Sequence, residues 1–237
     1  MKRVLLKLSG EALAGDRKDA SGQAHGFDEA TVQGVAKQVK AIVDEGIQVA
    51  VVIGGGNFWR GRSSKAIERT HADQIGMLAT VMNCIYTSEI FRSQGMKTAI
   101  MTPFAIGAFT ELFSKDKAIE ALEEGKVVFF AGGTGHPYFS TDTGVVLRAI
   151  EMEADEILLA KAVDGVYDDD PRTNPAAKRY DSISIDEVVS KGLGVVDGAA
   201  AVMAKENRVP MLVFKLDGTD SIARAARGDI DGTRVTV

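Results

Sequence analysis

The chain has 237 residues, of which 45% are hydrophobic, and its formal net charge is −5 at pH 7. This acidic balance, without any run of Lys or Arg, argues against non-specific binding to nucleic acid. The N-terminal sequence MKRVLLKLSG contains too short an apolar run for a signal peptide or a membrane span. We therefore expect a cytoplasmic protein that binds neither nucleic acid nor membrane.

Strands are expected at short, mainly apolar runs of the sequence. They are predicted over 3–10, 47–53, 97–102, 126–131, 156–160, 210–214 and 233–237, the last of these as an edge strand. The run at 47–53 is apolar at successive positions, which is typical of a parallel strand buried on both faces.

Helices are expected between these strands, and cap residues indicate where several of them begin. They are predicted after the N-cap Asp28, from about Ser64 to Ser93, after Ser114, over 145–154, after a capping box of Ser184 and Glu187, from about Asp197, and from Asp220. The alternation predicts an α/β fold in one domain over residues 1–237, with a doubly wound, mostly parallel central sheet and helices on both faces.

Cysteine and histidine give no sign of a metal site. Cys84 is the only cysteine, which excludes an intrachain disulfide and a cysteine-based zinc site. Its apolar surroundings predict a buried thiol. His25, His71 and His136 are scattered without the spacing of metal ligands.

Three glycine clusters follow predicted strands, at Lys7–Gly10, Gly54–Asn57 and Gly132–Gly135. Glycine lets backbone N–H groups converge on an anion, and a helix that begins directly afterwards adds its N-terminal dipole. Arg60, with Arg62 nearby, would add positive charge. The alternative is that the glycines only form tight turns. Because ligands in such sheets bind at the carboxyl ends of strands, we favour a phosphate site.

Two common nucleotide-binding fingerprints do not fit. Gly10 and Gly15 have the spacing of a Walker loop, but Asp16 and Arg17 stand where Lys and Ser or Thr are required. No G-x-G-x-x-G motif follows a strand. A P-loop kinase and a dinucleotide-dependent reductase are therefore disfavoured.

The segment TGHPYFSTDT, residues 134–143, gathers one serine and three threonine hydroxyls around Asp142. Hydroxyls can bind phosphate oxygens or a sugar, and the carboxylate could orient a lysine or bind Mg²⁺ through water. Alternatively, Thr141 or Asp142 caps the following helix. Taken as residues alone, Asp73 and the acidic segment 163–175 are more typical of a solvated surface.

Six segments together resemble the bacterial uridylate (UMP) kinases of the amino acid kinase superfamily: KLSGEAL, VVIGGGNFWRG, IGMLATVMN, GGTGHPYFSTDT, RAIEMEADEILLAKAVDGVYDDDP and RVPMLVFKL. The resemblance covers residues 2–237, and GGGN-x-x-RG and TG-x-P-[FY]-F-[ST]-TD are particular to the UMP-specific branch. It implies an amino acid kinase-like three-layer fold. It also implies Mg²⁺-dependent transfer of the ATP γ-phosphoryl group to UMP, which gives UDP and ADP, in the biosynthesis of CTP and UTP.

The resemblance further implies a role for particular residues by position. Catalytic roles would fall to Lys7, Arg60, Asp142 and Asp197. ATP would be bound by Lys7, Leu8, Ser9, Gly10, Gly56, Arg60, Lys161, Tyr167 and Asp170. UMP would be bound by Gly55, Asp73, Thr134, Gly135, His136, Pro137, Tyr138, Phe139, Ser140 and Thr141. Mg²⁺ would be held mainly by the nucleotide phosphates rather than by a set of protein ligands.

Two positions depart from the family pattern. His136 stands where many relatives have Asn, and LLAKAVDGVY differs from the common ATKVDGVY, which affects the placement of Lys161 near the adenine. Histidine changes charge near neutral pH, so a role for His136 on UMP would make activity pH-sensitive.

The resemblance implies a homohexamer built from dimers and regulation by UTP or GTP. The apolar segment Met77–Ile90 could serve such an interface, although a core helix would show the same pattern. Two other functions stay open: a kinase of the same superfamily that acts on carbamate or an amino acid, and a nucleotide sensor that binds without transfer.

Overall fold

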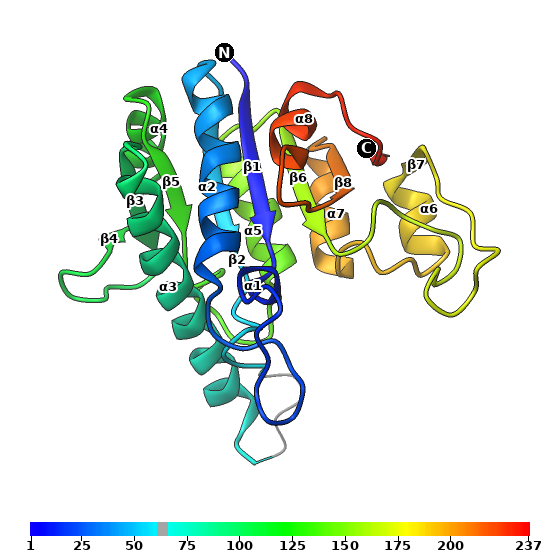
Figure 1. The fold of residues 1–237 in the computed structure, drawn as a ribbon, viewed down its shortest axis with the longest axis horizontal. Helices are drawn as coiled ribbons and strands as arrows, with labels where there is room; N and C mark the ends of the chain where they lie inside the picture. Colours follow the sequence, from blue (N-terminus) through cyan, green and yellow to red (C-terminus); the bar gives the residue numbers. More distant parts are fainter. Residues whose placement is uncertain (61–65) are drawn as a thin grey trace.

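The computed structural model describes residues 1–60 and 66–237 (Figure 1). Its strands are β1 (Arg3–Leu8), β2 (Gln48–Ile53), β3 (Thr98–Thr102), β4 (Glu111–Leu112), β5 (Val127–Phe130), β6 (Glu156–Lys161), β7 (Ser182–Ser184), β8 (Met211–Lys215) and β9 (Thr233–Thr236). Its helices are α1 (Gly10–Leu13), α2 (Glu29–Asp44), α3 (Arg69–Ser93), α4 (Lys115–Glu123), α5 (Thr141–Glu151), α6 (Ile185–Ser190), α7 (Gly198–Glu206) and α8 (Ser221–Arg227).

All the strands belong to one nine-stranded sheet with the order β4-β3-β5-β2-β1-β6-β8-β9-β7. Within the described ranges, neighbouring strands pair in parallel apart from β8 and β9, which are antiparallel. The predicted α/β class and mostly parallel sheet are therefore confirmed.

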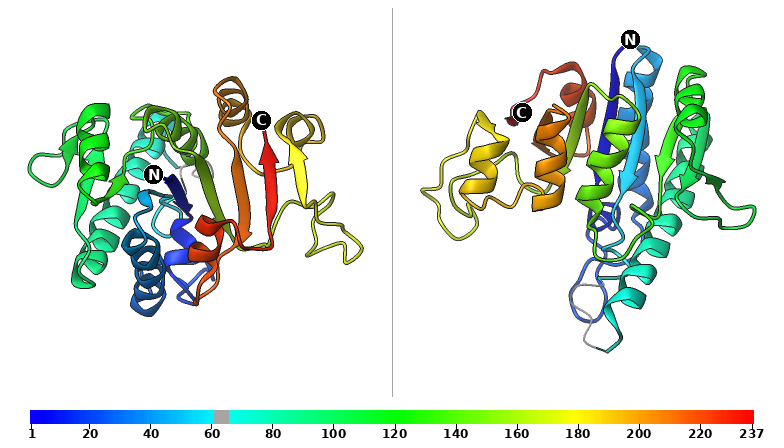
Figure 2. Two further views of the ribbon diagram at one scale, coloured as in Figure 1. Left: turned by 90° about the horizontal axis from the view of Figure 1, so that it is seen from above. Right: turned by 180° about the vertical axis from the view of Figure 1, so that it is seen from behind.

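Helices cover both faces of the sheet, as the sequence predicts. Val4, Leu6 and Leu8 of β1 point into an apolar core shared with α2, α3 and α8, whereas Leu5 points into a second core shared with α4, α5 and α7. Figure 1 shows α2 and α8 in front of the sheet, and the view from behind in Figure 2 shows α5 and α7 covering the other face. This double burial explains why the central strands are apolar at successive positions.

The expected helix starts at Asp28, Ser114, Ser184, Asp197 and Asp220 are confirmed as N-caps, whereas the helix expected over 145–154 begins earlier, at Thr141. The side chains of Asp28, Ser184 and Asp197 accept hydrogen bonds from the first turns of α2, α6 and α7. Neither Thr141 nor Asp142 caps α5, because the cap is Ser140, whose Oγ accepts from Thr143 N. Asp142 is thereby left in the first turn, where its carboxylate is free for other contacts.

Three expectations on the elements need comment. Strand β9 is not an edge strand, because it lies between β8 and β7. The short strands β4 and β7 were not expected from the sequence. The expected start of the long helix at Ser64 lies outside the described residues, as does Arg62, and α3 begins at Arg69 after the N-cap Glu68.

The thiol of Cys84 is buried in the α3 side of the core, as expected. Burial raises its pKa, which makes it a poor nucleophile. None of the helices in the described ranges has the length and apolar character that a membrane span requires.

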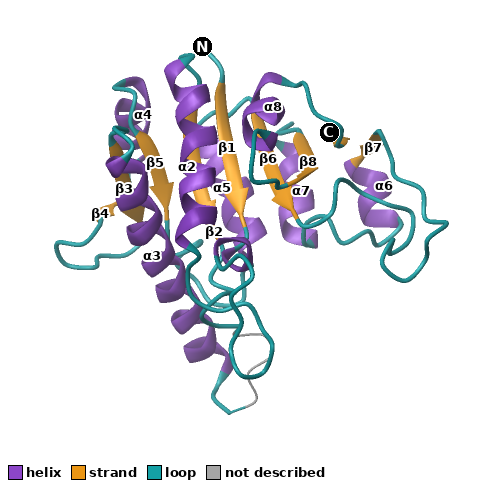
Figure 3. Cartoon of the chain, in the orientation of Figure 1, coloured by secondary structure: helices purple, strands orange, loops and turns teal. Residues whose placement is uncertain are grey.

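Strand β1 lies at the centre of the sheet, with β2 and β5 on one side and β6 and β8 on the other. The chain order therefore reverses at β1, and such a switch point opens a crevice at the carboxyl ends of the strands. Figure 3 shows the long loops gathered at that end of β1 and β2.

Candidate active site

A cleft of about 340 Å³ lies at the carboxyl ends of β1 and β2, beside the N-terminal half of α3 and the start of α5. Twelve of the residues expected in the site line it: Lys7, Ser9, Gly10, Gly55, Gly56, Asp73, Thr134, His136, Phe139, Ser140, Thr141 and Asp142. Residues far apart in the chain thus converge at the predicted position.

Tight packing accounts for two of the glycines in the cleft. A side chain at Gly55 would place its Cβ 2.9 Å from both Ala79 Cβ and Gly76 O of α3. At Gly10 the Cβ would lie 2.3 Å from Asn57 Oδ1 and 2.4 Å from the backbone oxygen of Gly54. The absence of side chains therefore lets the two loops pack on each other and on α3, and it also leaves their backbone exposed to the cleft.

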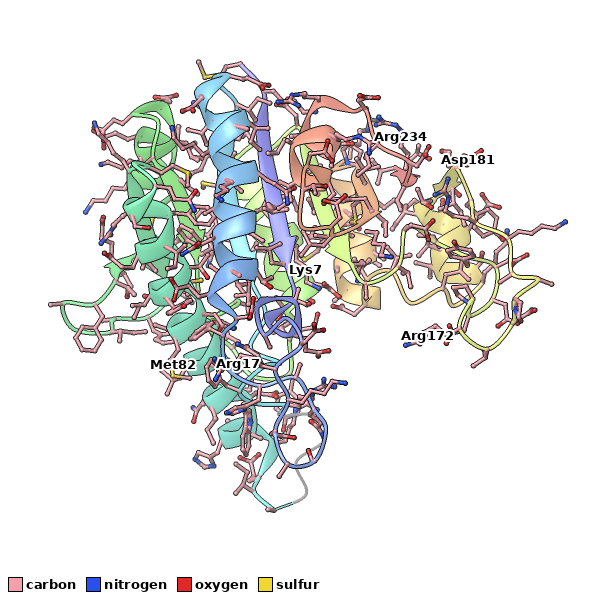
Figure 4. The ribbon with its side chains drawn as sticks, viewed as in Figure 1. Lys7, Arg17, Met82, Arg172, Asp181 and Arg234 are labelled. Atoms are coloured by element: carbon pink, nitrogen blue, oxygen red, sulfur yellow. The ribbon has the colours of Figure 1, made fainter. Side chains whose placement is uncertain are left out.

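The charge at the centre of the cleft comes from Lys7, at the end of β1, and Asp142, in the first turn of α5. Lys7 Nζ lies 3.1 Å from Asp142 Oδ1. The two atoms are not aligned for a hydrogen bond, and this buried oxygen accepts none from the described residues. Figure 4 shows Lys7 at the lower end of β1, where the loops begin.

Lys161 lies at the end of β6, the strand next to β1, and is mostly buried. Its pKa is lowered, first by burial and then by the positive charge of Lys7, while Asp142 acts in the opposite direction. Its ammonium donates to Val195 O at 3.0 Å. Lys161 therefore belongs to the same charge cluster as Lys7 and Asp142, in addition to lining the neighbouring cavity described below.

Arg60 lies beside this cleft rather than in it. Its guanidinium forms an ion pair with Glu11 of α1, with Nη2 2.7 Å from Oε1, and both side chains are half exposed. It lines a separate cavity of about 270 Å³ next to Gly56. A bound phosphate would have to compete with Glu11 for this cation or share it.

The 134–141 loop forms the wall of the cleft opposite the glycine loops. Tyr138 has a positive φ of 73°, which is uncommon for a residue with a side chain. Its N–H donates to Asp73 Oδ2 at 2.8 Å, and Arg69 donates to the same oxygen at 2.7 Å. Asp73, which its local sequence alone assigned to the surface, thus fastens this loop to α3. Gly135, Pro137 and Tyr138 do not line the cleft itself.

Asp197 does not line the cleft either. It accepts hydrogen bonds from the hydroxyls of Ser140 and Thr143 and from the backbone N–H groups of Ala199 and Ala200. Burial raises the pKa of this carboxyl, but these hydrogen bonds outweigh it and the net pKa is lowered. Asp197 therefore joins the starts of α5 and α7 and holds Ser140 in place.

A second, larger cavity of about 670 Å³ lies beyond β6 and includes Lys161, Tyr167 and Asp170. Tyr167 donates its hydroxyl to Asp164. Asp170 is bound by Arg172 through two hydrogen bonds of 3.0 and 2.8 Å, which lower its pKa to about 2. The ATP contact expected of Asp170 would have to be made beside this ion pair, whose Arg172 lies on an outlying loop in Figure 4.

Leu8 is the remaining expected site residue. Its side chain is fully buried in the core, and its backbone oxygen accepts a hydrogen bond from Gly54 N at 3.0 Å. Leu8 thus ties β1 to the second glycine loop and does not line a cavity.

Comparison with known proteins adds independent information to this geometry. Residues 2–215 match the model of the amino acid kinase family. The chain belongs to this family.

Solved structures with this amino acid kinase fold extend the comparison. The UMP kinase of Bacillus anthracis has a TM-score of 0.92 and 38% identity, over 99% of this chain and 96% of that chain. The UMP kinase of Ureaplasma parvum has a TM-score of 0.91 and 31% identity, over 100% of this chain and 99% of that chain. The uridylate kinase of Archaeoglobus fulgidus has a TM-score of 0.74 and 26% identity, over 100% of both chains. The expected family and fold are thereby confirmed.

Whether the cleft of this kinase could hold a metal ion depends on the ligand atoms that its residues provide, above all the carboxylate of Asp142. Among the described residues, no group of three or more His, Cys, Asp or Glu could hold a metal ion. Asp142 Oδ1 is a buried carboxylate oxygen without a hydrogen bond, and oxygen is the ligand atom that Mg²⁺ prefers. The site therefore fits a divalent cation held chiefly by nucleotide phosphates, with one carboxylate in reach.

Several residues of the kinase cleft were not expected from the sequence. Glu11 and Trp59 line it, as do Gly76, Met77 and Thr80 of α3. Glu11 follows directly after the first glycine loop, so its position in KLSGEAL was an available signal. The α3 residues gave none, because only the packing of the helix across the second glycine loop brings them to the cleft.

Proposed function

We propose that this chain is a UMP kinase, which transfers the γ-phosphoryl group of ATP to UMP and produces UDP and ADP. The observation that carries the proposal is the Lys7–Asp142 pair, which lies between the two glycine loops and the 134–141 loop. The similarity to UMP kinases over the whole chain supports this choice of acceptor.

In-line transfer between two bound nucleotides requires positioning and charge stabilisation, without a covalent intermediate. We assign the ATP phosphates to the loop of Leu8, Ser9 and Gly10 together with Gly56 and Arg60. Lys7 would neutralise charge on the transferred group. Lys161, whose pKa is lowered first by burial and then by the charge of Lys7, would add positive potential from the next strand.

Mg²⁺, when bound together with the nucleotide phosphates, would supply further charge neutralisation. Asp142 would orient Lys7 through their ion pair, and its Oδ1, which accepts no hydrogen bond from the described residues, is the carboxylate oxygen that could help to hold the cation. Asp197 would act indirectly, because its contacts hold Ser140 and Thr143 rather than a cavity.

UMP would occupy the side of the cleft nearest α3. We assign its phosphate to Gly55 and its nucleoside part to Asp73 and the 134–141 loop: Thr134, Gly135, His136, Pro137, Tyr138, Phe139, Ser140 and Thr141. A ribose hydroxyl could donate to Asp73, which already accepts from Tyr138 and Arg69. UMP binding and the position of the 134–141 loop would thus be coupled through the carboxylate of Asp73.

The adenine nucleotide would extend into the larger cavity beyond β6. Tyr167 and Asp170 border that cavity, and Lys161 lines its inner end. This arrangement gives donor and acceptor separate spaces on the two sides of Lys7, which is the geometry that direct transfer requires.

We further propose that the chain forms one domain, works in the cytoplasm in pyrimidine nucleotide synthesis, and assembles into a homohexamer. Helix α3 supports the assembly, because four apolar side chains on it are exposed: Ile75, Leu78, Met82 and Ile85. Figure 4 shows Met82 pointing outward from the helix. Regulation by UTP or GTP belongs to the same proposal, and adding either nucleotide to the assay tests it.

The function is tested by incubating the protein with ATP, Mg²⁺ and UMP and measuring UDP. Phosphorylation of carbamate, glutamate, aspartate or acetylglutamate instead of UMP would assign the chain to another branch of the family. Binding of both nucleotides without any UDP would identify a sensor.

A further inference from the structure

Two buried asparagines lie directly behind the glycine loops and do not line the cleft of about 340 Å³, although Asn57 borders the smaller cavity beside Arg60. Asn57 ends the GGGN segment and Asn83 lies on α3; they are 1% and 0% exposed. Asn57 Nδ2 donates to Asn83 Oδ1 at 3.0 Å, and Asn83 Nδ2 donates back to Asn57 Oδ1 at 2.8 Å. The two amides therefore form a closed, reciprocal pair.

The remaining N–H of each amide binds a glycine backbone. Asn83 Nδ2 donates to Gly54 O at 2.7 Å, and Asn57 Nδ2 donates to Gly26 O at 2.9 Å. All four side-chain N–H groups and both side-chain oxygens thus have partners. A fully satisfied polar network in a buried site is directional and rigid, whereas a partly satisfied one is costly.

The pair also touches the first glycine loop. Gly10, which begins α1, has no room for a Cβ because Asn57 Oδ1 would lie at 2.3 Å and Asn83 Nδ2 at 3.0 Å. One asparagine pair therefore sets the spacing between the loop expected to hold the ATP phosphates and the loop expected to meet the UMP phosphate.

The hydrogen bond from Asn83 to Gly54 O also fixes the direction of the neighbouring Gly55 N–H. The peptide unit is planar and the structure contains no cis peptide bond among the described residues, so Gly54 C=O and Gly55 N–H point in opposite directions. Because Asn83 binds the C=O, the N–H of Gly55 points away from Asn83. This N–H donates to no acceptor among the described residues, and Gly55 lines the cleft.

We infer that Asn83, supported by Asn57, is a positioning residue that aims the Gly55 N–H at the phosphate of the acceptor nucleotide. The inference rests on the proposed kinase function. Asn83 lies on the buried side of α3, whereas Met82 next to it is exposed, so Asn83 also connects that helix to the phosphate loops.

The test uses Asn83→Asp in the full-length protein, because the two side chains have nearly the same shape. The ionised carboxyl accepts hydrogen bonds but donates none, so Gly54 O and Asn57 Oδ1 both lose their donor. We expect kcat/KM for UMP to fall about 10- to 100-fold at about pH 8, with a smaller change in the KM for ATP.

A lower pH should restore part of the kcat/KM for UMP that Asn83→Asp loses. Burial raises the pKa of the introduced carboxyl, and its protonated form regains one O–H donor. Activity of Asn83→Asp relative to the wild type should therefore rise as the pH falls towards about 6. A residue that serves only to stabilise the fold would change the fraction of folded protein with pH, which circular dichroism at each pH detects, and would leave the activity per folded molecule unaltered.

Thr87→Val is the matched control. Thr87 lies one turn further along α3, is equally buried, and its hydroxyl has no hydrogen-bond partner among the described residues. We expect wild-type kinetics and pH profile for this variant, with folding of each protein verified by circular dichroism.

A measurement without turnover separates this inference from the kinase function. In ¹⁵N-glycine-labelled protein, UMP should shift the Gly55 amide signal in the wild type and shift it far less in Asn83→Asp. If the wild type forms no UDP but shows this difference, the kinase proposal fails and the positioning role stands. If the Gly55 signal responds equally in both proteins, or in neither, or if folded Asn83→Asp keeps wild-type kinetics, the positioning role is overturned.

Discussion

Lys7 and Asp142 face each other at 3.1 Å at the end of the central strand, although 135 positions of the chain separate them. The pair exists because β1 lies beside the start of α5, and Asp142 is available because Ser140 caps that helix. The ammonium of Lys7 lies in the cleft and donates no hydrogen bond to Asp142 Oδ1. The N–H donors of Lys7 are therefore available to a phosphate in the cleft.

Replacing Lys7 by Met should lower kcat by on the order of 10²–10³, by analogy with the loss of one preorganised donor. ATP binding should change much less, because the backbone loops remain. Steady-state kinetics with both substrates measure the effect. Lys2→Met is the control, since Lys2 precedes the same strand at the other end of the sheet. An unchanged kcat with only weaker ATP binding would show that Lys7 acts on the ground state.

The pKa of Lys161 should respond to its two charged neighbours in opposite directions. Its pKa is lowered by burial and by Lys7, so Lys7→Met should raise it towards the ordinary value of 10.5. Asp142→Asn removes the negative charge that opposes the shift and should lower the pKa further. NMR titration of ¹³C-labelled lysine side chains measures both changes. A pKa that stays constant in the two variants would contradict the charge cluster.

Asp197 should contribute stability that disappears in acid. Its pKa in the folded protein lies below the ordinary value of 3.8, so its contribution is complete above that value. The contribution is lost as the pH falls through the folded pKa. Asp197→Asn should cost about 1–2 kcal/mol at pH 7 and make unfolding less dependent on pH below about 4. Urea unfolding at a series of pH values tests this, and parallel curves for both proteins would refute it.

Asp73→Ala should raise the KM for UMP about tenfold, which is roughly the loss of one charged hydrogen bond. The substitution removes the acceptor of the Tyr138 N–H and so loosens the 134–141 loop. It changes no contact of the loops assigned to the ATP phosphates. The KM for ATP should therefore stay close to that of the wild type. Asp44→Ala, at the exposed end of α2, serves as the control. Equal effects on both KM values would argue against an acceptor-side role for Asp73.

Met82→Glu should reduce the assembly to smaller species, because it places a charge among the exposed apolar side chains of α3. Light scattering coupled to size-exclusion chromatography measures the mass. Val202→Glu is a matched control, since Val202 is similarly exposed but lies on α7. A wild-type mass for Met82→Glu would place the interface elsewhere.

The sequence predicts the central strands well, because β1 and β2 are buried on both faces and leave an unbroken apolar run. Strand β7 has three residues, which is too short for any periodicity to appear. The position of β9 inside the sheet depends on its pairing with β7 and β8, and pairing order is a property of the whole fold.

In the candidate site, too, the local sequence indicates some residues, whereas others are recognised only once the fold brings their partners together. Glycine loops with Lys7 are visible locally, because strand, glycine and helix follow one another in the chain. The role of Asp73 is not, because its partner Tyr138 lies 65 positions away. The Asn57–Asn83 pair was likewise hidden, since an amide within an apolar helix has no signature until its partner is placed.

Product analysis tests the central claim most directly. The protein is incubated with ATP and Mg²⁺ and either UMP, CMP, AMP, GMP or the amino acid acceptors, and the products are separated by anion-exchange chromatography. We expect UDP from UMP at a rate far above every other product, and its near disappearance in Lys7→Met. Absence of UDP from the folded wild type, or undiminished UDP formation by Lys7→Met, would contradict the account.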